Sequence, residues 1–353
     1  MQRSHRFHEL DLLRGIACVL VLLFHYLYRA QAAHWLTDQA SPWIADAARF
    51  GYLGVHLFFI ISGFVIFMSA DGAAPRDFVA SRVGRLYPAF WVAAPLTALV
   101  ALLMGSTTFA ATPSQLAVNL TMVPQWFGVK YVDGAYWSLA VELQFYLLVW
   151  LSLVTGWIQR PERLLAAWLA LATLVAIRPI YRLEFWLDAN WAPFFTAGIC
   201  CYLIRQRGVT RARLALLAWA FLLCVYFVCL QPMRKPDHAA WTVSDAVVAG
   251  ALLTVFFAAF LLIAFNRWRV AASPLTAWAG ALTYPVYLLH QYIGYLLIEA
   301  PGWRAVPFGL RVAITTALVL AAAWAVNRFV ERPLGPWLRR LAGGGRRLQP
   351  AAT

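Results

Sequence analysis

Long apolar runs separated by short polar segments follow one another along the whole chain. About 20 consecutive apolar residues in a helix cross the ~30 Å hydrocarbon core of a bilayer. The pattern therefore predicts an all-α, polytopic membrane protein with about ten transmembrane helices. The expected spans lie near residues 12–29, 50–70, 86–105, 136–157, 163–181, 191–205, 212–231, 243–265, 276–298 and 309–329.

One further apolar stretch, residues 114–128, does not fit this series. Pro113, Asn119 and Pro124 interrupt it. Non-helical backbone at membrane depth is tolerated only where protein or water surrounds it. We therefore expect this stretch to be an interfacial or re-entrant piece.

Composition supports one membrane domain without a soluble catalytic module. Of the 353 residues, 62% are hydrophobic and 12% are charged, whereas soluble domains carry roughly 25% charged residues. We assign residues 1–335 to the transmembrane domain. The arginine-rich end, residues 336–353, is expected to be a basic cytoplasmic tail.

The net charge of +14 first suggests nucleic-acid binding, but the distribution of basic residues indicates membrane topology instead. If the N-terminus is cytoplasmic, 20 of the 29 basic residues fall in cytoplasmic loops and span ends. This excess predicts that both termini are cytoplasmic. Glu9 and Asp11 occupy the region that is basic in a signal peptide, so we expect an uncleaved first span.

Cysteine usage argues against a disulfide framework and against a zinc site. All five cysteines lie in apolar stretches, with neither a C-x-x-C pair nor His/Cys ligand spacing. They are Cys18, Cys200, Cys201, Cys224 and Cys229.

Ionisable residues inside spans are costly, by roughly 3 kcal/mol or more each, and therefore indicate function. Arg14 and His25 are eleven residues apart, which is about 16 Å along one face of a helix. Imidazole titrates near neutral pH, so His25 is a candidate general base. The alternative is a neutral histidine hydrogen-bonded between helices.

Two further arginines stand where the third span begins. Arg82 and Arg85 share one helix face, and guanidinium groups bind phosphate oxygens in a bidentate manner. Together with Arg14, at the same expected depth, they predict a cradle for a polyphosphate ligand. Alternatively, they are ordinary positive-inside charges.

Other polar residues lie deeper in the spans. Glu142 is expected in the outer half of the membrane, with a structural salt bridge as the alternative to a catalytic role. In the second span, Gly51 and Gly54 allow close helix approach, and Ser62 can hydrogen-bond across helices.

The ninth expected span holds a further histidine, His290. Pro285 is expected to break the helix below it. His290 is a candidate for orienting His25 or for binding a substrate, and a packing role is the alternative.

The ordered motifs resemble the acyltransferase-3 family of integral-membrane acyltransferases, and they run from residue 9 to residue 333. They are Arg14-x10-His25, Gly51-Tyr-Leu-Gly54-Val…Ser62-Gly63-Phe64, Arg82-x-x-Arg85, Tyr136-Trp137-Ser138…Glu142, Tyr284-Pro285…Tyr287-Leu-Leu-His290 and Glu331-Arg332-Pro333. The chain is similar to the standalone form of the family, without an appended esterase-like domain. It departs at His56, a position that is often acidic in relatives.

The resemblance implies transfer of an acyl group from cytosolic acyl-CoA to a hydroxyl across the membrane, without a metal. It implies that His25 is catalytic and that Arg14, Arg82 and Arg85 are needed for activity. We expect these arginines to bind the phosphates of acyl-CoA, and we expect Glu142 or His290 to orient His25 or to bind the acceptor. Substrate contacts are expected from motif residues and from the histidine of the ninth span: Ser62, Tyr136, Trp137, Ser138 and His290.

Several alternatives remain at this stage. The transfer could be direct or could pass through an acyl-histidine. The acyl group could be acetyl or succinyl, and the acceptor could be an envelope glycan, an antibiotic or a lipid. We expect a bacterial inner-membrane enzyme. A proton-coupled transporter or flippase is the rival class, although no internal repeat supports it, and a structural scaffold leaves the polar residues unexplained.

Overall fold

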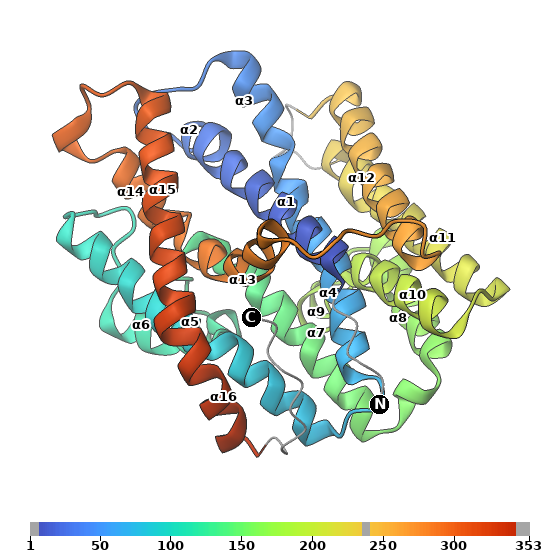
Figure 1. Cartoon of the computed structure of the whole chain (residues 1–353). Helices are drawn as coiled ribbons and strands as arrows, with labels where there is room; N and C mark the ends of the chain where they lie inside the picture. Colours follow the sequence, from blue (N-terminus) through green and yellow to red (C-terminus); the bar gives the residue numbers. More distant parts are fainter. Residues whose placement is uncertain (1–6, 235–240, 344–353) are drawn as a thin grey trace.

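Helices make up all the regular secondary structure of residues 7–234 and 241–343, the residues that the computed structural model describes (Figure 1). This confirms the all-α prediction. The α-helices are α1 (His8–Phe24), α2 (Ala30–Ala32), α3 (Pro42–Ala48), α4 (Leu53–Ala70), α5 (Pro75–Leu103), α6 (Pro113–Asn119), α7 (Trp137–Val154), α8 (Pro161–Ile177), α9 (Tyr181–Leu187), α10 (Ala192–Arg207), α11 (Arg211–Val225), α12 (Val243–Ala264), α13 (Pro274–Leu289), α14 (Tyr292–Ile298), α15 (Phe308–Val326) and α16 (Arg332–Leu341).

Short helical turns of other types extend several of these helices. The π-helical turns η1 (His25–Arg29), η6 (Tyr226–Leu230) and η10 (Asn327–Glu331) continue α1, α11 and α15 without a break. The 3₁₀ turns η2 (Arg49–Tyr52) and η4 (Gly134–Tyr136) lead into α4 and α7. In Figure 1, α1 and α13 lie near the centre of the molecule, with α11 and α12 on one flank and α15 and α16 on the other.

Seven helical segments of the described residues are long and apolar enough to cross a membrane, which confirms a polytopic membrane protein. The count of ten is not confirmed. The seven segments are His8–Ala32, Pro42–Ala70, Pro75–Leu103, Gly134–Val154, Arg211–Leu230, Val243–Ala264 and Phe308–Leu341.

Shorter helices stand at the three remaining expected spans. The span expected at 163–181 overlaps α8, with 17 residues, and the span expected at 191–205 overlaps α10, with 16. At 1.5 Å per residue, α10 is only about 24 Å long. Its residues from Ala192 to Ile204 are all buried, so it packs among other helices and does not have to match the lipid thickness by itself. The span expected at 276–298 is divided between α13 and α14.

The break in this last segment follows Leu289 and does not lie at Pro285, so the expectation of a break there was wrong. Proline has no N–H and therefore leaves the carbonyl of the residue four positions earlier without its helical partner. That residue is Ala281, and Asn327 Nδ2 donates to its oxygen at 3.3 Å. The neighbouring helix thus satisfies the freed carbonyl, and α13 continues through the proline.

Small residues let α4 approach α1 as the sequence predicted. A Cβ atom on Gly51 would lie 2.2 Å from the backbone oxygen of Leu20, and one on Gly54 would lie 2.5 Å from the oxygen of Ala17. Both distances are shorter than any tolerated contact, so only glycine fits. The predicted close approach is confirmed.

The segment at 114–128 does not form a span. It folds into α6 and the 3₁₀ turn η3 (Pro124–Phe127), which are too short to cross a bilayer. Asn119 is fully buried there: its amide donates to the carbonyl of Lys130, and its oxygen accepts from the N–H of Val132, at 2.9 and 3.0 Å. These bonds hold the piece against the loop that leads into α7.

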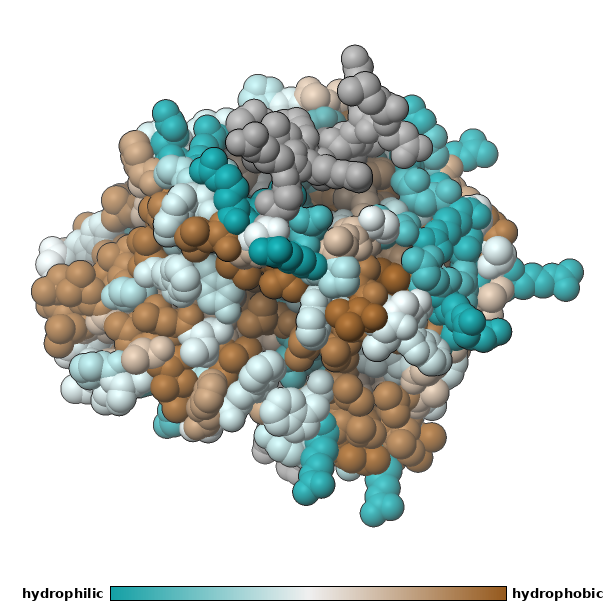
Figure 2. All heavy atoms as spheres, turned by 90° about the horizontal axis from the view of Figure 1, so that it is seen from below, coloured by the Kyte–Doolittle hydropathy of each residue, from teal (hydrophilic) through white to brown (hydrophobic). Residues whose placement is uncertain are grey.

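The end of the chain is only partly described. Residues 336–341 belong to α16, which packs on α5 where Gly335 meets Gly84. Residues 344–353 lie outside the described residues, so the boundary drawn at residue 335 stays a prediction. Figure 2 shows one end of the molecule, where hydrophilic side chains gather over part of the face and apolar side chains extend to the rim.

Candidate active site

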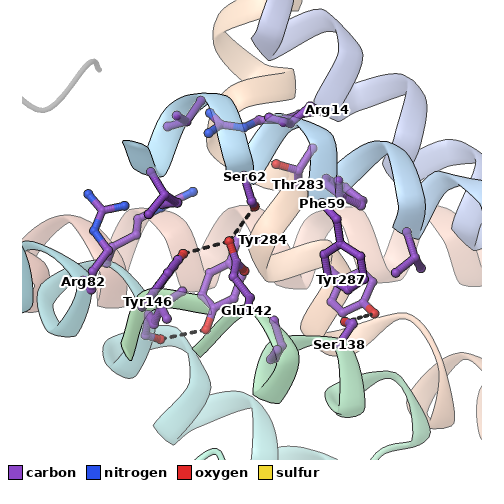
Figure 3. Close-up of a pocket in the computed structure, with 18 residues that line it drawn as sticks. Arg14, Phe59, Ser62, Arg82, Ser138, Glu142, Tyr146, Thr283, Tyr284 and Tyr287 are labelled. Atoms are coloured by element: carbon purple, nitrogen blue, oxygen red, sulfur yellow. Dashed lines mark hydrogen bonds between the residues drawn. The ribbon is translucent and has the colours of Figure 1, made fainter. Parts of the chain in front are cut away.

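A cavity of about 120 Å³ lies among α1, α4, α5, α7 and α13 (Figure 3). Apolar side chains such as Phe58 and Phe59 form part of its wall. Six of the residues predicted to form the site line this cavity: Arg14, Ser62, Arg82, Arg85, Ser138 and Glu142. The structure thus gathers the three arginines of the expected phosphate cradle around one space, together with the candidate catalytic carboxylate.

Glu142 is held in the cavity by two hydroxyl groups. Ser62 Oγ, from α4, donates to Glu142 Oε1 at 2.7 Å, and the hydroxyl of Tyr146 donates to the same oxygen at 2.7 Å. Figure 3 shows both bonds. The guanidinium carbon of Arg82 lies 5.7 Å from the ring centre of Tyr146. Glu142 is therefore anchored beside the arginines. From the sequence we expected Glu142 in the outer half of the membrane and the arginines at its cytoplasmic edge, yet all four side chains line the same cavity.

Arg85 and Arg14 each have a carboxylate partner. Arg85 Nη1 lies 3.4 Å from Glu331 Oε1, and Arg14 Nη1 lies 3.3 Å from Asp11 Oδ1. Asn327 Nδ2 donates to the other oxygen of Glu331 at 2.7 Å. The carboxylates fix the positions of the two cations, while both guanidinium groups still line the cavity.

His25 and His290 form a buried pair outside this cavity. His290 Nε2 lies 3.1 Å from His25 Nδ1, and the two rings meet edge to face with centres 4.8 Å apart. His25 is the first residue of the π-helical turn η1, and His290 lies at the break between α13 and α14. Irregular helical turns of this kind occur frequently at functional sites.

The backbone fixes the tautomers of the pair. His25 Nδ1 lies 2.8 Å from the carbonyl oxygen of Val21, and His290 Nδ1 lies 2.8 Å from that of Tyr287. A carbonyl oxygen only accepts, so Nδ1 carries the proton in both rings. The single proton on His25 Nδ1 is then shared between the carbonyl of Val21 and His290 Nε2, and His25 Nε2 keeps a free lone pair. This is the form that a general base requires.

Tyr287 connects the cavity with the histidine pair. It lines the cavity, and its ring centre lies 5.4 Å from that of His290. Its hydroxyl donates to the carbonyl of Ala135 at 2.9 Å and lies 2.5 Å from Ser138 Oγ. The two groups of predicted site residues are thus neighbours that share one tyrosine.

The remaining predicted substrate residues lie beside the cavity and do not line it. The Tyr136 hydroxyl donates to the carbonyl of Leu288 at 3.0 Å, which ties the start of α7 to the end of α13. Trp137 packs against Trp191, with ring centres 5.2 Å apart. Their roles in substrate binding stay predictions.

A buried carboxylate holds the α13–α14 break in place. Asp133 accepts from the backbone N–H groups of Ala135 and Tyr292, both at 2.9 Å. Burial raises the pKa of Asp133 to about 7, although the two N–H groups lower it. Asp133 therefore fastens the loop before α7 to the residues that follow His290.

Sequence reasoning did not assign roles to Tyr146, Tyr287 and Glu331. Tyr146 stands one helical turn after Glu142, which is a usable signal. Tyr287 and Glu331 stand inside the quoted motifs, but the contacts they make are with residues 149 and 246 positions away. Only the fold reveals those contacts.

Comparison with known proteins agrees with this architecture. The model of the acyltransferase domain family, acyltransferase-3, matches residues 7–328. No solved structure matches the chain significantly.

Curated relatives cover most of the chain at low identity. Nodulation protein 10 of Rhizobium leguminosarum bv. viciae is 26% identical over 94% of this chain and 93% of its own length. The acyltransferase MdmB of Streptomyces mycarofaciens is 24% identical over 99% of this chain and 95% of its own. The peptidoglycan O-acetyltransferase OatA of Listeria monocytogenes is 24% identical over 95% of this chain and 57% of its own. The chain belongs to the acyltransferase-3 family and is a membrane-embedded acyltransferase.

Proposed function

We propose that this enzyme moves an acyl group, of the acetyl or succinyl type, from acyl-CoA to a hydroxyl group of an envelope glycan or a similar acceptor. The observation that carries the proposal is the pairing of two neighbouring sites. One is a cavity lined by Arg14, Arg82 and Arg85; the other is a histidine pair with a free basic nitrogen on His25.

The three arginines support acyl-CoA as the donor, because guanidinium groups match phosphate oxygens in charge and geometry. A cavity of about 120 Å³ is smaller than the roughly 300–1,000 Å³ of pockets that enclose a whole drug-sized ligand. We therefore propose that only the acyl-pantetheine end enters and that the nucleotide stays at the mouth. The phosphates would then meet the arginines on the cytoplasmic side.

His25 would supply the base for the transfer. Its Nε2 accepts the proton of the acceptor hydroxyl while the hydroxyl oxygen attacks the thioester carbonyl. The C–S bond then breaks, and the CoA sulfur leaves as a thiolate that takes up the proton from His25 Nε2, which restores the neutral base. The carbonyl of Val21 and His290 Nε2 both face Nδ1 and would keep the ring in the required tautomer. General-base assistance of this kind contributes roughly 10²–10⁴-fold to a rate.

The acceptor side of the proposal rests on relatives. One relative is named as a peptidoglycan O-acetyltransferase, an activity on an envelope glycan. We propose a glycan acceptor at the outer face of the bacterial plasma membrane, with both chain termini in the cytoplasm. The 20-to-9 distribution of basic residues supports that orientation.

The substitution His25→Ala tests the proposal. Purified His25→Ala should bind CoA as the wild type does. Its rate of acyl transfer should fall below about 1% of the wild-type rate, since it loses the base. The matched control is His34→Asn. His34 is exposed, and its backbone φ of 56° is one that asparagine adopts readily. Transfer above a few per cent in a folded His25→Ala protein would remove His25 from the mechanism.

A further inference from the structure

Four aromatic residues pack together next to the histidine pair. We call Trp35, Phe109, Tyr292 and Tyr295 the aromatic cluster. The ring centres of Phe109 and Tyr292 are 4.3 Å apart, and those of Trp35 and Tyr295 are 5.6 Å apart. The ring centre of Tyr295 lies 6.3 Å from that of His25. The cluster is therefore a direct neighbour of the proposed base.

The order of residues along two separate elements indicates that the arginine cavity and the aromatic cluster lie on opposite sides of His25. In the first span, Arg14 lines the cavity and His25 follows, and Trp35 comes just after the end of this span at Ala32. From α13 into α14, Tyr287 lines the cavity, His290 follows, and Tyr295 comes next. In both elements, a residue of the cavity comes first along the chain, the histidine second and a residue of the cluster third. A donor in the cavity and a ligand at the cluster would thus approach His25 from different ends.

Two buried polar atoms beside the cluster have no hydrogen-bond partner among the described residues. They are the hydroxyl of Tyr295 and Oε1 of Gln291, on side chains that are 1% and 5% exposed. The Gln291 amide group approaches the Tyr295 hydroxyl, but neither this hydroxyl nor Gln291 Oε1 has a partner that meets the distance and angle limits of a hydrogen bond. Residues 291 and 295 are one helical turn apart and share a face. Buried polar groups are almost always paired, so these two atoms point to a polar ligand.

The chemistry of the three groups defines that ligand. His25 Nε2 and Gln291 Oε1 only accept hydrogen bonds, whereas the Tyr295 hydroxyl can also donate. A ligand with two neighbouring hydroxyl groups satisfies all three: one hydroxyl donates to His25, and the other donates to Gln291 and accepts from Tyr295. Trp35 and Tyr292 are only partly buried and offer flat apolar faces. A pyranose ring carries both features, vicinal hydroxyls and an apolar face.

We propose that Gln291, Tyr295 and the aromatic cluster form the acceptor subsite, which binds a pyranose with the reacting hydroxyl at His25. This inference rests on the proposed acyltransferase function and adds the residues that hold the acceptor. Arg29, whose guanidinium lies 5.3 Å from the ring centre of Trp35, marks the exposed side of the cluster. The sugar would enter from that side.

The test uses the full-length protein in lipid nanodiscs with acetyl-CoA and soluble alcohols. The probes are glucose, N-acetylglucosamine and their β-1,4-linked tetramers, with glycerol and n-octanol for comparison, and mass spectrometry detects the ester. The variants Tyr295→Phe and Gln291→Leu each remove one hydrogen-bonding group and keep most of the side chain. Each should raise KM for the sugar about three- to tenfold, as loss of one neutral hydrogen bond does. Calorimetric CoA affinity should stay at the wild-type value.

Matched substitutions elsewhere serve as controls. Tyr181→Phe and Trp43→Ala alter residues that are 74% and 73% exposed and lie outside the cluster, and they should leave KM unchanged. Trp35→Ala should raise KM for the sugar, because it removes a stacking face.

The outcomes separate the subsite from the function on which it rests. A sugar KM that does not change in Tyr295→Phe and Gln291→Leu overturns the subsite. CoA binding without an ester on any sugar, or an ester only on glycerol or octanol, overturns it as well. A wild-type protein that binds no CoA overturns the proposed function itself.

Discussion

At the residue scale, Arg85 has contacts that fix its position and still exposes its charged group to a ligand. Its ion pair with Glu331 is long, at 3.4 Å, and the Arg85 side chain is 41% exposed. Glu331 is only 8% exposed, and its other carboxylate oxygen accepts from Asn327 Nδ2, so the carboxylate keeps a partner if Arg85 turns away. The ring of Tyr284 lies 5.6 Å below the guanidinium carbon. We therefore expect Arg85 to be able to exchange the long contact with Glu331 for a phosphate while the ring of Tyr284 keeps the guanidinium group in place.

The first prediction concerns Arg82 and Arg85. Arg82→Ala and Arg85→Ala should each weaken CoA binding by about ten- to a hundredfold, because each removes a charge-assisted contact worth about 1.5–3 kcal/mol. Lysine at either position keeps the charge but loses the planar fork, so it should restore only part of the affinity. Isothermal titration calorimetry with CoA on solubilised protein measures both effects.

Arg160→Ala is the matched control. Arg160 is exposed, precedes α8 and does not line the cavity, so its removal should leave CoA affinity unchanged. If CoA binds both alanine variants as tightly as the wild type, the two arginines are only topology signals. The donor site would then have to lie elsewhere.

Site residues could be predicted from the sequence where a polar or charged side chain stands in an apolar span, because burying such a group in the membrane costs free energy. Arg14, His25 and Glu142 are ionisable groups inside apolar runs, and that cost identified them without a structure. Their partners could not be predicted. His25 and His290 are 265 positions apart and Ser62 and Glu142 are 80 apart; no periodic pattern relates such positions, and only helix packing brings them together.

At the scale of helices, glycine determines how closely α4 and α10 pack. A Cβ on Gly63 would lie 2.1 Å from the backbone oxygen of Phe195, and one on Gly198 would lie 2.0 Å from that of Ile60. Each helix thus presses its backbone against a glycine of the other. Small residues have this role in membrane helix packing generally. The contact matters for the site because Ser62, which holds Glu142, is the residue before Gly63.

The second prediction follows from this contact. Gly198→Ala should force α4 and α10 apart, at a cost of about 1–3 kcal/mol, as overpacking does. The solubilised variant should show a lower apparent melting temperature and reduced acyl transfer. Gly309→Ala is the control, since no atom lies within 4 Å of the added Cβ. Equal melting temperatures for Gly198→Ala and the wild type would contradict the tight packing.

Helix lengths were harder to predict than the existence of helices. The apolar run at 191–205 was correctly assigned to a helix, but α10 lies buried among its neighbours, and a buried helix need not match the lipid. For α13, the sequence rule that proline breaks a helix did not hold, because Asn327 from a distant segment supplies the missing hydrogen bond. Tertiary contacts therefore overrode the local rule in both cases.

At the scale of the whole molecule, the histidine pair lies between the arginine cavity and the aromatic cluster. Arg14 and Tyr287, which line the arginine cavity, precede His25 and His290 in the sequence, whereas Trp35 and Tyr295 of the aromatic cluster follow them. This arrangement allows a donor and an acceptor to approach a shared base from different sides. Membership of the acyltransferase-3 family favours this interpretation over the transporter or flippase considered from the sequence.

The third prediction tests which end faces the cytoplasm. Asp71 follows α4 and accepts from Arg207, at the end of α10, at 2.8 Å, so these helix ends lie on one face. If both termini are cytoplasmic, cysteines at positions 71 and 205 should react in intact cells only with a membrane-permeant maleimide. A cysteine at the exposed Lys130 position should also react with an impermeant one. The native cysteines should give little background, because four are buried and Cys18 is half-buried. The reverse labelling pattern would put Arg82 and Arg85 on the outer side, out of reach of cytosolic acyl-CoA.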